Sequence, residues 1–340
     1  MRILVFGAGA IGGYLGAILS AAGADVTLVA RGAQYDALSR RGVILESPKR
    51  RSDPIRVNVC RQGEERPPYD LIFICLKSQQ IGESAAHVAG LLAHDGSLVF
   101  PQNGIPWWYF EKLDSPLRGT RLPSLDPDGR IASAFRLDNV IGAVIYLPTD
   151  HPEPGRIVLA DQPTDRLVVG ELDGELRPRL EAIKALLEPA GLPVVATDRI
   201  RDFKWQKLLS NGVFNLLCTV TQSSPQQVVM FPETRTVAKA MLEEFLAVAA
   251  AVGVVPKTST DDILAYTRNR AGFPPSTLQD ARAGRSLELD ALDNAVLDIA
   301  RLTGVPAPTL EHVVACANLL NRRIIEDGVA FRPAPVRKAG

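Results

Sequence analysis

Residues 1–31 read MRILVFGAGAIGGYLGAILSAAGADVTLVAR, and this stretch decides the fold of the N-terminal half. Residues 2–6 form a largely apolar, β-branched run, which predicts a buried parallel strand. The motif G-A-G-A-I-G follows at 7–12, then a helical pattern at 13–22 and a second strand pattern at 25–30. A G-x-G-x-x-G motif between a strand and a helix is typical of a dinucleotide-binding turn. This context favours a Rossmann unit over a glycine-rich turn without a ligand.

The glycines of this turn suit a diphosphate. Gly7 permits the tight turn, Gly9 lets the backbone approach the phosphates, and Gly12 lets the helix pack on the sheet. Free N–H groups at the start of the helix then face the negative charge. The predicted cofactor-binding residues of the turn are Gly7, Ala8, Gly9, Ala10, Ile11 and Gly12.

The end of the second strand distinguishes NAD from NADP. NAD-binding proteins place Asp or Glu there for the ribose 2′-hydroxyl, whereas an Arg accommodates the 2′-phosphate of NADP. This chain has Arg31 there and no carboxylate before Asp36. A solvated surface Arg is the alternative, but a guanidinium is well matched to a phosphate. We therefore predict NADP(H) as the cofactor.

The composition excludes several protein classes. The 340 residues suffice for two domains, and 38 basic and 38 acidic residues give a formal net charge of zero. A neutral chain indicates no nucleic-acid partner, and no apolar run is long enough to span a membrane. The four cysteines form no C-x-x-C, and no metal is expected. Because the first strand leaves no room for a signal peptide, we expect a cytoplasmic protein.

Strand patterns stop near residue 198, and helical patterns follow. Further strands are expected at 69–76, 97–100, 140–146, 156–159, 167–169 and 194–197. Those at 140–146, 156–159 and 167–169 are spaced as hairpins, which predicts antiparallel additions to the parallel sheet. Helices are expected at 199–217, 233–252, 261–267, 284–303 and 309–325. The prediction is an α/β Rossmann domain over 1–198, binding NADP, followed by an all-α catalytic and substrate domain over 199–340.

Polar residues follow two of the predicted strands, at the edge where open α/β sheets bind ligands. Lys77 follows the strand at 69–76, and Gln80 lies three residues further on. Asn103 follows the next strand, although an Asn before Gly is also common in turns. The aromatic run at 107–110 is expected to pack rather than to line a site.

One predicted helix carries polar residues among apolar ones. Lys207, Asn211 and Asn215 recur every fourth residue and so share one helix face. Such groups are costly to bury unless other polar groups meet them. One interpretation is a structural network with a partner carboxylate. The functional one is that this face closes over a nicotinamide between the domains, where a lysine of lowered pKa donates a proton to a ketone oxygen.

A second polar segment precedes the helix expected at 284–303. Ser276 and Gln279 form a capping-box pattern, which predicts Ser276 as a helix N-cap. The same hydroxyl would suit a substrate carboxylate. Glu288 lies near the start of the next helix, and if it points inward it is the natural partner of Lys207.

Together these residues resemble the ketopantoate reductase (2-dehydropantoate 2-reductase) family over nearly the whole chain. The matching segments are G-A-G-A-I-G at 7–12, Arg31, C-L-K-S-Q-Q at 75–80, Q-N-G at 102–104, W-x-K-L-x-x-N at 205–211, Asn215, S-x-L-Q-D at 276–280 and G-R-x-x-E-x-D at 284–290. The resemblance implies a Rossmann domain and a helical domain that reduce a 2-keto acid with NADPH.

The resemblance also implies roles for the residues at the reacting centre. Lys207 is the general acid, and Glu288 assists it and binds the substrate or the nicotinamide ribose. Ser276 binds the substrate carboxylate, and Asn211 and Asn215 bind its hydroxyl and carbonyl oxygens.

The remaining implied contacts belong to the cofactor. Asn103 lies at the junction of nicotinamide and substrate. Arg31, Lys77 and Gln80 bind the adenosine phosphate and ribose.

Two departures from the family pattern bear on the substrate. The segment before Ser276 carries the apolar Phe273, and residues 221–225 lack an expected Asn. Reduction of ketopantoate to pantoate is the favoured reaction, and a less hydroxylated 2-keto acid or another carbonyl compound is the alternative. A non-catalytic NADPH-sensing protein is the alternative of a different class. A helical second half also leaves a homodimer open.

Overall fold

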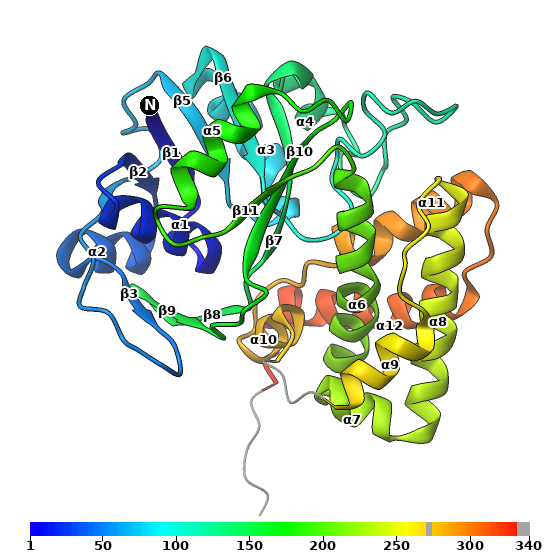
Figure 1. Ribbon diagram of the computed structural model, residues 1–340. Helices are drawn as coiled ribbons and strands as arrows, with labels where there is room; N and C mark the ends of the chain where they lie inside the picture. Colours follow the sequence, from blue (N-terminus) through cyan, green and yellow to red (C-terminus); the bar gives the residue numbers. More distant parts are fainter. Residues whose placement is uncertain (270–273, 332–340) are drawn as a thin grey trace, which may run out of the picture. The chain divides into compact units, whose positions relative to one another are not determined.

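The structure, a computed structural model, describes residues 1–269 and 274–331 (Figure 1). The chain divides into two compact units, and the boundary along the sequence falls between Phe203 and Lys204. The predicted substrate determinant Phe273 lies outside the described residues.

An eight-stranded sheet forms the centre of the first unit, with strand order β11-β10-β7-β6-β5-β1-β2-β4. Its strands are β1 (Arg2–Phe6), β2 (Asp25–Val29), β4 (Asn58–Cys60), β5 (Tyr69–Ile74), β6 (Leu92–Phe100), β7 (Val140–Tyr146), β10 (Arg166–Glu171) and β11 (Val194–Ala196). All neighbours pair in parallel except β7 and β10. The inner strand β1, between β5 and β2, is buried on both faces, as its apolar run predicts.

Helices cover this sheet, as the strand–helix alternation predicts (Figure 1). They are α1 (Ala10–Ala21), α2 (Gly32–Arg41), α3 (Ser78–Leu91), α4 (Arg130–Ala134) and α5 (Pro178–Leu187). Contacts join α1 to β1 and β2, and α5 to β11. The aromatic run at 107–110 is buried, so the prediction that it packs is confirmed.

A separate three-stranded sheet of order β3-β9-β8 corrects one prediction. Its strands are β3 (Ile44–Glu46), β8 (Thr149–Glu153) and β9 (Arg156–Leu159). The segment 156–159 was expected in the main sheet, but β9 pairs with β3 and β8 instead. Ile157 explains the position, because this buried side chain packs on α1, where a Cβ added to Gly13 would lie 2.7 Å from its Cδ1. Of the three strands expected as antiparallel additions, β10 is the one that pairs antiparallel within the main sheet. The strand β7 pairs in parallel with β6 and so continues the parallel sheet.

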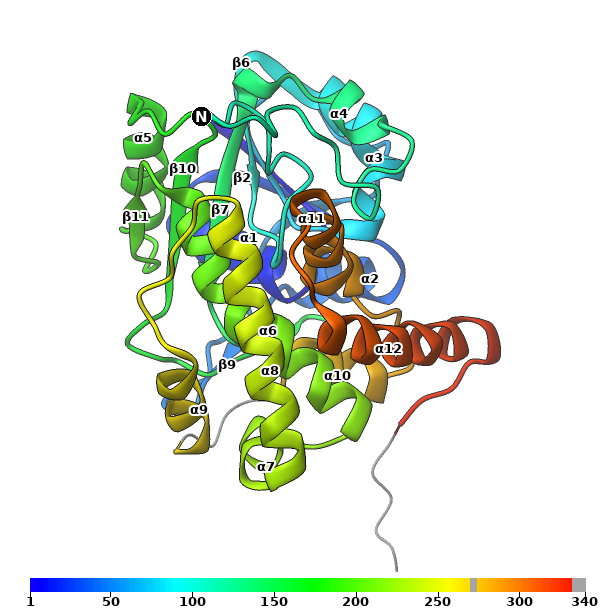
Figure 2. The same ribbon diagram turned by 90° about the vertical axis from the view of Figure 1, so that its right-hand side faces the viewer.

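The second unit is helical, as predicted (Figure 2). Its helices are α6 (Ile200–Thr221, beginning in the first unit), α7 (Pro225–Met230), α8 (Pro232–Ala251), α9 (Thr260–Arg268), α10 (Ser276–Arg282), α11 (Ala295–Thr303) and α12 (Pro308–Asp327). Figures 1 and 2 show α12 running crosswise to α8, which it contacts. The helix expected from residue 284 begins later, with a π-helical turn at Asp290–Asn294.

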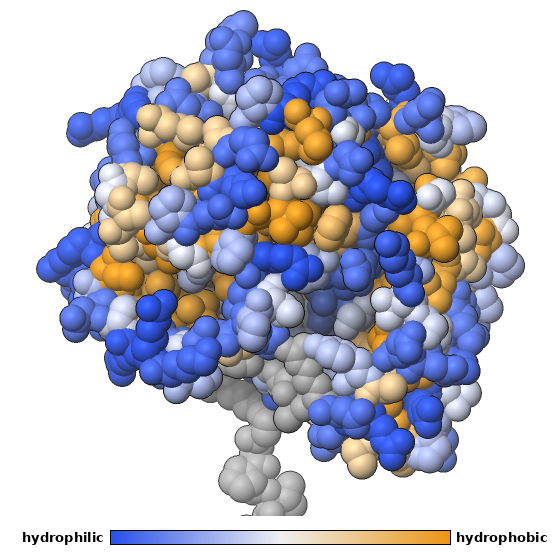
Figure 3. Space-filling model, viewed as in Figure 1, coloured by the Kyte–Doolittle hydropathy of each residue, from blue (hydrophilic) through white to orange (hydrophobic). Residues whose placement is uncertain are grey.

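The described residues contain no helix that is both long and apolar enough to cross a membrane. Within the same residues, no cluster of His, Cys, Asp and Glu could hold a metal ion. On the face shown in Figure 3, hydrophilic and hydrophobic residues are mixed.

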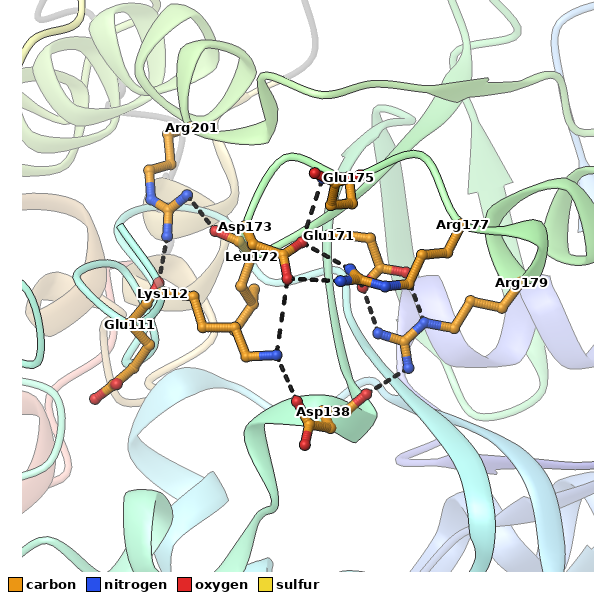
Figure 4. Close-up of polar contacts among 10 residues, drawn as sticks. All are labelled: Glu111, Lys112, Asp138, Glu171, Leu172, Asp173, Glu175, Arg177, Arg179 and Arg201. Atoms are coloured by element: carbon orange, nitrogen blue, oxygen red, sulfur yellow. Dashed lines mark hydrogen bonds and ion pairs between the residues drawn. The ribbon is translucent and has the colours of Figure 1, made fainter. Parts of the chain in front are cut away.

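A charged network fixes the first turn of α6 within the first unit (Figure 4). The guanidinium of Arg201 donates to the carbonyl oxygens of Tyr109, Glu111 and Leu172, at 2.7, 2.7 and 2.8 Å. Next to it, the buried carboxylate of Glu171 accepts hydrogen bonds from Arg179. The start of the helix that carries Lys207 is therefore held by three charge-assisted bonds.

Replacing this guanidinium should destabilise the first unit. In Arg201→Met, three half-buried or buried segments lose their donor, and the expected cost is about 3 kcal/mol of the free energy of unfolding. Urea unfolding followed by tryptophan fluorescence measures this cost. The control variant Arg40→Met, which replaces an exposed arginine, should change the free energy of unfolding by less than about 0.5 kcal/mol. Equal stability of Arg201→Met and the parent protein would contradict the assigned role.

Candidate active site

The glycine turn has the geometry that a diphosphate requires. Gly7 has φ +102°, and a Cβ added to Gly12 would lie 1.9 Å from the carbonyl oxygen of Gly7. A Cβ on Gly9 would meet no atom within 4 Å, so this side of the turn is open to a ligand. The helix α1 starts at Ala10 with no side-chain cap at Gly9. The residues present thus fit a nucleotide diphosphate held by backbone N–H groups.

The carboxyl ends of β2 and β4 bring two arginines to one edge of the sheet. Arg31 is exposed at the start of α2, directly after β2. Arg61 follows β4, which pairs in parallel with β2, and its guanidinium stacks 3.8 Å from the ring centroid of Tyr35. Arg61 was not among the predicted residues, because the pairing of the short strand β4 with β2 leaves no local sequence pattern.

Three further predicted residues lie at the ends of β5 and β6. Lys77 is the residue before α3, and the backbone N–H of Gln80 donates to its carbonyl oxygen at 2.9 Å. Asn103 follows β6 in the exit turn. The neighbouring Gln102 donates to the carbonyl oxygens of Ile74 and Leu76, which ties this turn to the end of β5. Because β5 lies beside β1, these residues share a sheet edge with the glycine turn.

The predicted polar face lies on α6. Lys207 and Asn211 are half-buried, and Asn215 is 5% exposed. The Nδ2 of Asn215 has no hydrogen-bond partner among the described residues. A buried amide without a protein partner is costly unless a ligand or water meets it, so this position can bind a polar group.

Lys207 and Glu288 come together in the second unit. Burial lowers the pKa of Lys207 to about 8, and the nearby negative charge of Glu288 opposes this shift. Glu288 precedes the π-helical turn and is half-buried. A lysine with this pKa is still mostly protonated at pH 7 and can release a proton readily.

A second lysine, which was not predicted, interacts electrostatically with Lys207 and Glu288. Lys204 lies three residues before Lys207 on α6 and is 2% exposed. Its pKa is lowered to about 7 by burial and by the charge of Lys207, while Glu288 raises it. A spacing of three residues also keeps side chains on one helix face, which was the available signal.

The segment around Ser276 corrects another prediction. Ser276 is the first residue of α10 and is exposed, and Pro275 occupies the N-cap position. The side chain of Gln279 donates to the carbonyl oxygen of Pro274 at 2.8 Å, so the predicted capping box is wrong. Proline at the N-cap cannot accept from the third helical residue as serine would.

Comparisons with known proteins decide the family. The model described as Ketopantoate reductase PanE/ApbA matches residues 3–174, and the one described as Ketopantoate reductase PanE/ApbA C terminal matches residues 199–321. The chain belongs to the ketopantoate reductase family. The 2-dehydropantoate 2-reductase of Mesorhizobium japonicum is 35% identical over 330 residues, which are 96% of this chain and 99% of that protein.

Solved structures agree with this ketopantoate reductase assignment. A candidate ketopantoate reductase from Ralstonia solanacearum MolK2 has a TM-score of 0.88 at 32% identity, over 95% of this chain and 98% of that one. A D-mandelate dehydrogenase solved with NADH and anilino(oxo)acetate shares the fold alone, with a TM-score of 0.80 at 18% identity over 96% and 100% of the chains. The predicted family, fold class and oxidoreductase activity are confirmed, and the family depends on a nicotinamide cofactor.

Proposed function

We propose that this ketopantoate reductase family member reduces a 2-keto acid to a 2-hydroxy acid with NADPH, with 2-dehydropantoate as the favoured substrate and pantoate as product. The observation that carries the proposal is the half-buried Lys207, whose pKa burial lowers to about 8, within electrostatic reach of Glu288. The M. japonicum relative, a 2-dehydropantoate 2-reductase, supports the substrate.

The proposed reaction needs one hydride and one proton. When bound, the reduced nicotinamide supplies the hydride to the carbonyl carbon. Lys207 donates its Nζ proton to the carbonyl oxygen, which leaves a neutral amine and a C–OH group. Glu288 orients the ammonium and binds the substrate or the nicotinamide ribose. Asn211 and Asn215 bind the hydroxyl and carbonyl oxygens of the substrate.

The remaining proposed contacts follow from the family membership. Ser276 binds the substrate carboxylate through its hydroxyl, and Asn103 lies where nicotinamide meets substrate. The glycine turn holds the diphosphate, and Lys77 and Gln80 bind the ribose. Arg31 selects NADPH through the 2′-phosphate. On this assignment residues 1–198 form the NADP-binding domain and residues 199–340 the catalytic and substrate domain.

A substrate screen that follows NADPH absorbance tests the proposal. Pyruvate, 2-ketoisovalerate and ketopantoate, each with NADPH and with NADH, distinguish ketopantoate from less hydroxylated acids. The second candidate is a reductase of another carbonyl compound, because residues 221–225 lack the Asn that the family pattern leads us to expect. NADPH binding without turnover of any carbonyl compound would instead indicate a sensor. The homodimer stays a prediction, and the molar mass from light scattering would test it.

The pH dependence of kcat/KM should report the lysine cluster. Because Lys207 must be protonated to donate, kcat/KM should fall as the pH rises through the lysine pKa of about 8. Lys204→Met should leave the alkaline limb near pH 8, because Lys204, with a pKa of about 7, is already mostly neutral where Lys207 titrates. Lys204→Arg makes the positive charge at this position permanent, so the limb should move to lower pH.

Stopped-flow rates with ketopantoate between pH 6 and 10 locate the alkaline limb in both variants. Gln206→Met is the matched control, since Gln206 is exposed on the same helix. An unchanged limb in Lys204→Arg would show that Lys204 does not act on Lys207 through charge.

A further inference from the structure

The side chain of Gln34 connects three parts of the first unit. Gln34 lies in the first turn of α2 and is half-buried. Its Nε2 donates to the carbonyl oxygen of Ala8 in the glycine turn at 2.7 Å. Its Oε1 accepts from the backbone N–H of Gly155 at 2.9 Å and from the Nε2 of His151 at 3.1 Å.

These contacts fix the orientation of the amide. Rotation by 180° would place the NH₂ group of Gln34 against the N–H of Gly155 and its oxygen against the carbonyl oxygen of Ala8, so both ends would be mismatched. The hairpin of β8 and β9, which supplies His151 and Gly155, is itself packed on α1 through Ile157. The hairpin therefore holds Gln34, and Gln34 holds the turn.

The contact with Ala8 sets the direction of a neighbouring N–H group. In a trans peptide the C=O of one residue and the N–H of the next point in opposite directions. With the carbonyl of Ala8 turned toward Gln34, the N–H of Gly9 points away from it. A Cβ on Gly9 would meet nothing within 4 Å, so the turn is open at this residue.

We propose that Gln34 is a positioning residue for the cofactor: its amide fixes the plane of the Ala8–Gly9 peptide, so that the N–H of Gly9 meets the cofactor diphosphate. The inference rests on the NADPH-binding part of the proposed function. It also gives the β8–β9 hairpin a role, namely to hold the acceptor side of Gln34. Binding of the diphosphate thereby depends on a segment more than a hundred residues from the turn.

Gln34→Met keeps the length of the side chain and removes its polar contacts. The Kd of NADPH, measured by its fluorescence without substrate, should rise about tenfold. Adenosine 2′-phosphate, which has no diphosphate, should compete with unchanged affinity in the same variant. Arg31→Ala should differ from Gln34→Met by weakening the binding of both NADPH and adenosine 2′-phosphate. Gln62→Met, at an exposed glutamine, is the matched control and should bind both ligands as the parent does.

A second variant separates the contact with the turn from the contact with the hairpin. Gln34→Glu keeps both acceptor contacts but cannot donate to Ala8, so in 0.5 M salt, which screens its charge, NADPH binding should still weaken about tenfold. His151→Phe leaves the hydrogen bond from Gln34 to Ala8 in place and should change the Kd of NADPH less than twofold. Unchanged NADPH binding in both Gln34 variants, or equal weakening of adenosine 2′-phosphate, would overturn the inference. A parent protein that binds neither NADPH nor NADH would overturn the proposed function itself.

Discussion

Lys207→Met should lower kcat for the reduction of the preferred 2-keto acid by about a thousandfold and leave NADPH binding within about twofold. A general acid contributes about 10² to 10⁴ in rate, and burial with a lowered pKa places this lysine toward the upper part of that range. Methionine fills a similar volume without a charge, so the packing of α6 should persist. Single-turnover rates and NADPH fluorescence titration measure the two quantities separately.

Two comparisons make this result specific. Gln206→Met is the control for a polar-to-apolar change on α6 and should keep kcat within about twofold. Glu288→Gln should lower kcat by a smaller factor, about 10², because the ammonium remains but loses its charged partner. If Lys207→Met retained more than a tenth of the parent kcat, the proton would have to come from another group, and the proposed mechanism would be wrong.

The glycine turn was predictable because its determinants are local. Gly7 and Gly12 are required within a single strand–turn–helix, where φ +102° at one residue and a 1.9 Å approach at the other exclude a side chain. The polar face of α6 was predictable for a similar reason, since a helix turns every 3.6 residues whatever surrounds it.

The placement of β9 was not predictable, because it depends on a segment distant in sequence. The strand at 156–159 was expected, but β8 was not, and β9 pairs with β8 and with the distant β3 instead of joining the main sheet.

Two other misses are local. At Ser276, Pro275 takes the cap position that the motif assigned to the serine. Lys204 lies three residues before Lys207, outside the spacing of four residues that defined the polar face.

Arg31→Glu should reverse the choice of cofactor. The expected loss is about a hundredfold in kcat/KM for NADPH, because a charge-assisted bond to the 2′-phosphate is replaced by repulsion between two anions. The value for NADH should stay within about threefold or increase, since a carboxylate at the end of β2 can bind the ribose 2′-hydroxyl. Steady-state rates with each cofactor at saturating 2-keto acid measure this ratio.

The control for this reversal lies on the same helix. Arg40→Glu makes the same change of charge at an exposed residue in the last turn of α2, and should leave the ratio unchanged if the effect is local. The nearby Arg61 decides how far the ratio moves. If Arg61 shares the 2′-phosphate, the loss in Arg31→Glu should be smaller than about a hundredfold, and Arg61→Ala in that background should enlarge it. A parent protein that already prefers NADH would contradict the role of Arg31, because neither arginine would then have a phosphate to bind.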